Sequence, residues 1–466
     1  MALLYPFDRA QGAVREVDNM SFDGYYAGYA QLDITPPLGV RMDGYGTAGV
    51  RRVSTGVLDP IYVRAIAFGQ GEKRAVMLVL DMLALYGPEL AQWPIRIAQR
   101  LGLPDAAVFL CCTHSHTTPG VGDYRDVPDQ QYDDWLFRRL GDAAQMALDD
   151  LTAVVDVRGG ETQAEGMAFV RRFLMKNGNT HTNPALNRPE EIAAPASDTD
   201  QSLRLMRILR QAGPEIVLIN FQAHPDCIGG SLISADFPGA VCSRVEELTP
   251  NARCVFLNGA EGQMVRTDRM NWDAEDYKKD YAHCVAYGRR LADVALSIYD
   301  TVPTTDMAGF DFGQKYIKGR SKRGMLTKDE YERRLALDAE GRSAELDPDP
   351  KVASYKLLMA KSVRDMEVRQ VDAFDLPVTV IAFCGLAFVG YPGEPFNEAG
   401  KWLRAEGRYP VTNVCCQTNG SWGYLPDRGG FEQGGYEPIC TRQTAGVLEE
   451  LTDAARAIFD QFDTTT

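Results

Sequence analysis

Three of the five histidines lie just after apolar segments, where side chains from different strands can converge on one site. His114 and His116 are two residues apart in the sequence Thr-His-Ser-His, and such residues point to the same side of an extended chain. One or both imidazoles can then present a lone pair to a cation at about 2 Å. For this pattern by itself, a metal site and a hydrogen-bonding loop both remain open.

Two further polar residues stand at comparable positions. His224 precedes Pro225 after the sequence Asn-Phe-Gln-Ala, and Glu394 follows a long apolar segment in Tyr-Pro-Gly-Glu-Pro-Phe. A carboxylate beside a buried strand is costly unless it is paired or bound to metal, and a solvent-facing glutamate at a helix N-terminus is the alternative. We interpret His181, in a polar loop, and His283, in a helical run, as structural or surface residues.

Apolar runs and turn residues indicate the elements that position these side chains. We expect strands at residues 25–34, 61–68, 74–83, 107–112, 215–223, 252–257, 378–389 and 410–417, with the second and third forming a hairpin. Helical spacing predicts helices at 88–101, 274–299, 328–366 and 444–462. Hairpins mixed with strand-helix steps predict an α/β fold, a layered sandwich of mixed, largely antiparallel sheets flanked by helices.

Composition narrows the classes of partner. The chain has 466 residues, of which 45% are hydrophobic, and a net charge of -15 that repels phosphate backbones and anionic lipid. Nucleic acid is therefore not an expected partner. No run reaches the roughly 18 to 20 apolar residues that a membrane span needs, and the first residues do not resemble a signal peptide. We expect a cytoplasmic protein without stable membrane insertion, and a homo-oligomer remains open.

The ten cysteines are spread along the chain, and none forms a Cys-x-x-Cys pair. A cysteine zinc site therefore has little support. Adjacent cysteines inside apolar runs are typical of small buried strand residues in a reducing compartment.

Five segments, in the same order, resemble the catalytic domain of the neutral, non-lysosomal ceramidase family. They are residues 32–37 (Leu-Asp-Ile-Thr-Pro-Pro), 113–116 with Pro119-Gly120, 220–225, 392–396, and 423–424 with 435–437. Because these segments run from near the N-terminus to about residue 440, the resemblance covers almost the whole chain. It implies one catalytic domain over residues 1–466, with a helical insertion at 327–367 and without the family's C-terminal immunoglobulin-like domain.

The resemblance also implies a ligand set. Zinc would be bound by His114, His224, Glu394 and Tyr424; Tyr436 lies in the same stretch as Tyr424 and is assigned to the substrate side. Zinc lowers the pKa of water from 15.7 toward about 7, so that water can attack an amide carbon at neutral pH.

The same resemblance implies four residues around the substrate. His116 would polarise the carbonyl oxygen, and Tyr436 or His116 would protonate the leaving amine. Arg171 or Arg172 would orient polar groups of the substrate, unless this arginine pair is a surface charge cluster.

One segment departs from the family pattern. The family reads Asn-x-Gly-Asp-x-Ser-Pro, whereas residues 258–264 read Asn-Gly-Ala-Glu-Gly-Gln-Met, so Gln263 replaces the serine associated with ceramide cleavage. We expect Asn258 and Gln263 to face a smaller, soluble amide substrate. Asp226 and Asp236 would orient metal ligands or cap loops.

The sequence therefore predicts a zinc-dependent amidohydrolase. A zinc-dependent esterase, lyase or isomerase on the same site is an alternative, and a non-catalytic, metal-stabilised binding protein is another.

Overall fold

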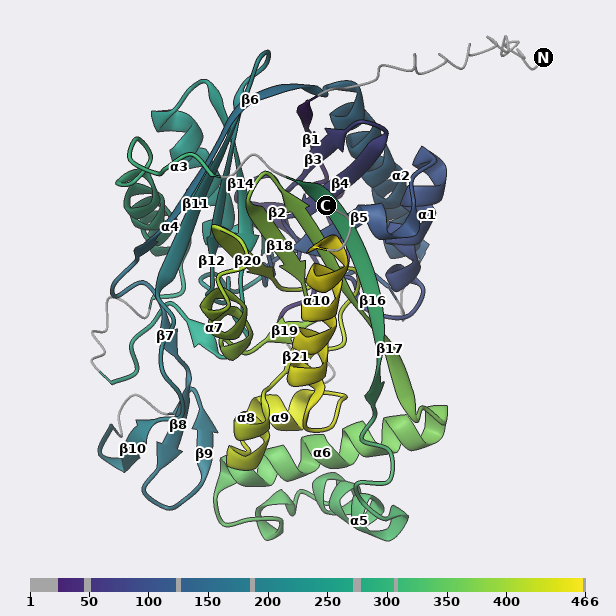
Figure 1. Ribbon diagram of the computed structural model, residues 1–466. Helices are drawn as coiled ribbons and strands as arrows, with labels where there is room; N and C mark the ends of the chain where they lie inside the picture. Colours follow the sequence, from purple (N-terminus) through teal and green to yellow (C-terminus); the bar gives the residue numbers. More distant parts are fainter. Residues whose placement is uncertain are drawn as a thin grey trace, which may run out of the picture.

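Two β-sheets face each other at the centre of the computed structural model, which describes residues 24–45, 52–122, 127–184, 189–270, 278–305 and 309–463 (Figure 1). One sheet has eight strands and the other has four. Their facing sides share one hydrophobic core that includes Phe68, Phe109, Leu218, Phe383 and Phe388. Most neighbouring strands are antiparallel, which confirms the predicted mixed sandwich.

The eight-stranded sheet has the order β14-β12-β11-β6-β1-β3-β4-β5. It is parallel only at its two edges, where β12 pairs with β14 and β4 with β5. The strands are β1 (Tyr25–Asp33), β3 (Tyr62–Gln70), β4 (Lys73–Leu80), β5 (Val108–Cys112), β6 (Thr152–Gln163), β11 (Ser202–Arg210), β12 (Glu215–Phe221) and β14 (Ala252–Asn258).

The four-stranded sheet has the order β16-β17-β18-β20. Its strands are β16 (Phe310–Arg320), β17 (Ala373–Phe383), β18 (Leu386–Gly390) and β20 (Val411–Cys415). The sequence predicted one continuous strand at 378–389, but the structure turns at Cys384-Gly385. Both of these residues have positive φ, 48° and 82°, as a two-residue type I′ hairpin turn requires.

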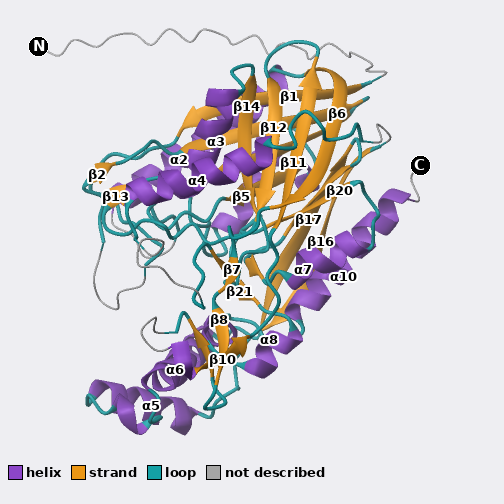
Figure 2. Cartoon of the chain, turned by 90° about the vertical axis from the view of Figure 1, so that its left-hand side faces the viewer, coloured by secondary structure: helices purple, strands orange, loops and turns teal. Residues whose placement is uncertain are grey.

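Helices cover the outer faces of both sheets, and Figure 2 shows the resulting layers from the side. On the eight-stranded sheet these are α1 (Trp93–Leu101) and α2 (Val127–Asp149) over one half, and α3 (Asp236–Leu248) and α4 (Tyr281–Leu296) over the other. On the four-stranded sheet they are α7 (Glu398–Ala405) and α10 (Val447–Asp463).

The helix predicted at 444–462 is confirmed as α10, and the one predicted at 88–101 is present as α1, which begins at Trp93 after a 3-10 turn at Leu90–Gln92. Gly102 ends α1 in the left-handed conformation. The predicted helix at 274–299 begins at Tyr281, and residues 274–277 of that prediction lie outside the described residues. The predicted helical stretch 328–366 consists of two helices, α5 (Lys328–Ala339) and α6 (Pro350–Arg369). Whether they are an insertion stays a prediction.

One end of the molecule is formed by the helices α5 and α6 and the short strands β8 to β10, as Figure 1 shows. A three-stranded sheet joins β10 (Ile192–Pro195), β8 (Arg172–Met175) and β9 (Thr180–Thr182), near α8 (Arg428–Gln433) and α9 (Tyr436–Cys440). Two-residue pairings link β2 (Gly56–Val57) with β13 (Leu232–Ile233), β7 (Phe169–Val170) with β15 (Met264–Val265), and β19 (Glu394–Pro395) with β21 (Tyr424–Leu425). Among the described residues, no helix is both long and apolar enough to span a bilayer.

Candidate metal centre

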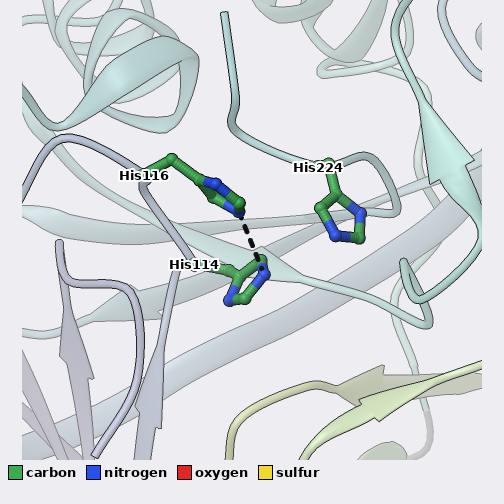
Figure 3. A group of neighbouring side chains, drawn as sticks. All are labelled: His114, His116 and His224. Atoms are coloured by element: carbon green, nitrogen blue, oxygen red, sulfur yellow. Dashed lines mark hydrogen bonds between the residues drawn. The ribbon is translucent and has the colours of Figure 1, made fainter. Parts of the chain in front are cut away.

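Side chains from three strand ends meet at one buried point. His114 comes two residues after β5, His224 three residues after β12, and Glu394 opens β19. Figure 3 shows the imidazoles of His114, His116 and His224 gathered around a common space. The convergence predicted from the sequence is therefore present in the fold.

The donor atoms are separated by similar distances. Glu394 Oε2 lies 3.5 Å from His114 Nε2 and 3.2 Å from His224 Nε2. In a tetrahedral zinc site with ligands at 2.0–2.1 Å, neighbouring ligand atoms are about 3.3–3.4 Å apart. The two distances from Glu394 Oε2 are therefore close to the ligand spacing of such a site.

The backbone leaves the Nε2 atoms of both histidines facing this space. His114 Nδ1 lies 2.9 Å from the carbonyl oxygen of Leu83, and His224 Nδ1 lies 3.0 Å from that of Glu261 and 3.2 Å from that of Met264. A proton on Nδ1 satisfies these acceptors and leaves a lone pair on Nε2. His224 Nε2 and Glu394 Oε2 make no hydrogen bond of acceptable geometry with any described residue, as expected of atoms that need a cation.

The pKa values of His114, His116 and Glu394 depend strongly on one another and on burial. Burial opposes a charge on His114, but Glu394 and Glu261 outweigh it and raise the pKa of His114 to about 9. Burial opposes ionisation of Glu394 too, yet His114 and His224 hold its pKa well below the usual value. Burial and the neighbouring His114 lower the pKa of His116 far below 6.5, so this imidazole stays neutral.

The backbone around the ligands is unusual in two places. His114 has φ of 73°, in the left-handed region that costs a non-glycine residue energy and that is enriched at functional sites. Gly393 has φ of 157°, and a Cβ atom there would lie 2.3 Å from the carbonyl oxygen of Gly423. This close approach allows β19 to pair with β21, which sets Glu394 directly opposite Tyr424.

Tyr424 lies beside the histidines and is held by Arg171. Its ring stacks on that of His224 with centroids 6.4 Å apart, and the Arg171 guanidinium lies over the ring, 5.3 Å from its centre. Tyr436 packs edge-on against Tyr424 at 5.8 Å. Burial is the main cause that raises the pKa of each tyrosine, so both phenols keep their protons.

The three predicted substrate-binding residues make bonds within the protein. Arg172 donates to the carbonyl oxygens of Gly430 and Gly434 and lies over the ring of Phe396. Asn258 donates to the carbonyl oxygens of Thr113 and Ala223, the residues that precede His114 and His224. Gln263 donates to side chains near the start of α7, and its Oε1 has no described partner. Their roles toward a substrate stay predictions.

The two aspartates proposed to orient ligands, and the two histidines interpreted as structural, each have a partner within the protein. Asp226 pairs with Lys279 at 2.9 Å, and Asp236 accepts bonds from the backbone N–H groups of Cys227, Ile228 and Phe237, as a loop cap does. His181 pairs with Asp349 and His283 with Asp280. All ten cysteines are free, and nine are buried.

One residue was missed by the sequence analysis. Glu261 is completely buried, and it groups with His114, His224 and Glu394 as a set whose donor atoms all lie within 4.8 Å of one another. It stands three residues past the end of β14, the same relation that His224 has to β12. This position after a buried strand was the sequence signal that could have identified Glu261.

Comparison with known proteins finds similarity in structure. The sequence matches no known protein-family profile and no curated protein. The structure is similar to that of the neutral ceramidase from Pseudomonas aeruginosa, with a TM-score of 0.68 and 16% identity over 94% of this chain and 75% of that chain. A ceramidase complexed with C2 gives a TM-score of 0.68 and 15% identity over 94% and 76%. At this identity the likeness shows a shared fold.

Proposed function

We propose that this protein is a zinc-dependent hydrolase that cleaves an amide bond of a small soluble substrate. His114, His224 and Glu394 would hold the metal, with Tyr424 as the fourth ligand. The observation that carries this proposal is the 3.2 and 3.5 Å spacing of Glu394 Oε2 from the Nε2 atoms of two imidazoles whose Nδ1 atoms face backbone carbonyl oxygens. The fold shared with two ceramidases, enzymes of amide cleavage, supports the choice of reaction.

The residues present fit zinc. Two imidazoles, a carboxylate and a phenol oxygen are donors that zinc accepts. When bound, zinc would polarise a substrate carbonyl and lower the pKa of water to about 7. Arg171 lies over the ring of Tyr424 and donates to the carbonyl oxygen of Gly262 and to Glu437, so it would act by holding the tyrosine in place.

His116 and Tyr436 are the groups proposed to contact the substrate. His116 is only partly buried, and its Nε2 lies 3.3 Å from His114 Nε2, beside the ligands. A neutral imidazole there can donate one N–H to a carbonyl oxygen. Tyr436 is partly exposed and keeps its phenolic proton, which it can give to a leaving amine.

Metal content tests the site. We expect His114→Ala and His224→Ala to retain less than about a tenth of the zinc of the wild type, because each loses one of few ligands. His181→Ala and His283→Ala are matched controls, since each removes a histidine paired with an aspartate outside the site. Elemental analysis of the purified proteins decides: a wild type without zinc, or ligand variants with full zinc, overturns the proposal.

Product identity tests the reaction. We expect a panel of N-acyl amines, amino acids and sugars to contain a substrate that is split into acid and amine, and the ligand variants to lose that activity. Ester products, or an eliminated or isomerised product, would assign the site to an esterase, lyase or isomerase. A zinc-loaded protein that leaves every substrate intact would indicate a binding protein.

Gln263→Ser tests the substrate class. Gln263 is tied to Ser197, Asn397 and Glu398 near the start of α7, so we expect that restoring the hydroxyl alone does not yield ceramide cleavage. Turnover of ceramide by this variant would show that one hydroxyl separates the two substrate classes.

A further inference from the structure

Glu261 is a buried carboxylate with very few partners. Its side chain is completely buried, and neither oxygen accepts a hydrogen bond of acceptable geometry from a described residue. The Cys416 thiol beside it is a weak donor. An isolated ionised carboxylate in such surroundings costs several kcal/mol, so a compensating charge is expected nearby.

The nearest group to Glu261 is a proposed metal ligand. Oε2 lies 3.0 Å from His224 Nδ1, on the side of the imidazole opposite the Nε2 that faces Glu394. Carboxylates at this position orient metal-bound imidazoles and make them stronger donors. Glu261 therefore lies behind a ligand rather than in the space between the ligands.

The backbone holds this carboxylate close to the other one. Gly262 N–H donates to the carbonyl oxygen of Pro395 at 2.9 Å, which ties the Glu261 segment to β19. A Cβ atom on Gly262 would lie 2.5 Å from the carbonyl oxygen of Glu394, so only glycine permits this approach. The chain thus brings two buried carboxylates, Glu261 and Glu394, to one small site.

The charge of the site in its metal-bound form matches a dication. Burial raises the pKa of Glu261, and Arg171, which lowers it, is paired with Glu437 at 2.8 Å. Metal ligation requires neutral His114 and His224, and in that form the two carboxylates would leave a charge of about -2. One divalent cation balances that charge.

We propose that Glu261 is a positioning and charge-balancing residue of the metal site, which orients His224 and is tolerated in the core because a divalent cation is bound. This inference rests on the metal site of the proposed function but not on the reaction or the substrate. It predicts opposite effects of Glu261→Gln with and without metal, which a purely structural role does not.

The experiment compares wild type, Glu261→Gln and the control Glu398→Gln as full-length proteins at pH 8. Zinc affinity is measured by competition with a chromophoric chelator, and melting temperature is measured with and without zinc. We expect Glu261→Gln to bind zinc about 10- to 100-fold more weakly. Without zinc it should melt about 1–3 °C above the wild type, because a buried, poorly partnered carboxylate has been replaced by an amide of similar shape.

Glu398→Gln should match the wild type in zinc affinity, since Glu398 bonds to Gln263 outside the ligand group. Glu261→Asp keeps the negative charge, but its shorter side chain places the carboxylate farther from His224. It should therefore weaken zinc binding without raising the melting temperature of the metal-free protein. Equal zinc affinity of Glu261→Gln and wild type overturns the inference, as does a Glu261→Gln protein that is insoluble or less stable without zinc. A wild type that binds no zinc overturns the proposed function as well, so the two failures are distinct.

Discussion

Two glutamates, Glu437 and Glu261, are both completely buried, but their surroundings are opposite. Glu437 accepts hydrogen bonds from Arg171 at 2.8 Å and Thr182 at 2.7 Å, and it lies 3.4 Å from Arg172 Nε. No comparable set of donors surrounds Glu261 in the described part of the chain. The Glu437 cluster is complete, because its carboxylate finds its counter-charges within the protein, whereas we propose that a bound cation completes the Glu261 cluster by compensating its charge. A deficit of hydrogen-bond donors, rather than the burial of charge itself, distinguishes the proposed metal site.

The largest expected effect comes from breaking the complete cluster. Glu437→Gln leaves Arg171 and Arg172 without their counter-charge, and we expect a loss of about 3–5 kcal/mol in the free energy of unfolding. Urea unfolding measures it, with the exposed Glu432→Gln as a control within about 0.5 kcal/mol of the wild type. If Glu437→Gln unfolds like the wild type, the two clusters do not differ as described.

Removing metal tests the incomplete cluster directly. At free zinc of about 100 times the dissociation constant, binding should stabilise the folded state by about 2.7 kcal/mol. Dialysis against a chelator should therefore lower the melting temperature, and added zinc should restore it in the wild type but not in His224→Ala. A melting temperature that ignores zinc would contradict a cation-requiring cluster.

Asn258 combines features of both clusters, since its bonds are made within the protein but fix the residues next to the proposed ligands His114 and His224. Asn258→Ala removes the bonds at 3.0 and 3.2 Å to the residues preceding His114 and His224. We expect a loss of about 1–3 kcal/mol in stability and weaker zinc binding, measured by denaturation and by chelator competition. Unchanged zinc affinity would leave Asn258 with a structural role alone.

A pH-dependent effect concerns a buried lysine that has no ion pair with any described residue. Lys322 donates to the carbonyl oxygens of Pro438 and Ile439, and burial lowers its pKa to about 7. Between pH 7 and the unfolded value near 10.4, the unfolded chain binds more protons than the folded one, so this group makes stability rise with pH. Relative to Lys322→Met, the wild type should gain stability over that window in denaturation measured at several pH values. A constant difference between the two proteins would contradict the lowered pKa.

The sequence predicted strands and helices well where a single periodic run marks an element, as at residues 107–112 and 88–101. It placed His114, His224 and Glu394 at strand ends, and the fold brings them together. It missed Glu261, because a carboxylate in a glycine-containing turn has no periodic signal. The pairing of Glu394 with Tyr424 joins segments 30 residues apart, so only tertiary structure sets it. The Cys384-Gly385 turn was hidden because the four residues on either side of it, 380–383 and 386–389, are all apolar.

The long connection between β16 and β17 bears on how this fold can change in evolution. Arg320, where β16 ends, lies directly opposite Ala373, where β17 begins, so the intervening chain with α5 and α6 leaves and re-enters the sheet at neighbouring points. The entropic cost of closing a loop rises by only about 0.6 kcal/mol for each doubling of its length. Lineages can therefore lengthen, shorten or exchange this excursion while the sheet that carries it keeps its register.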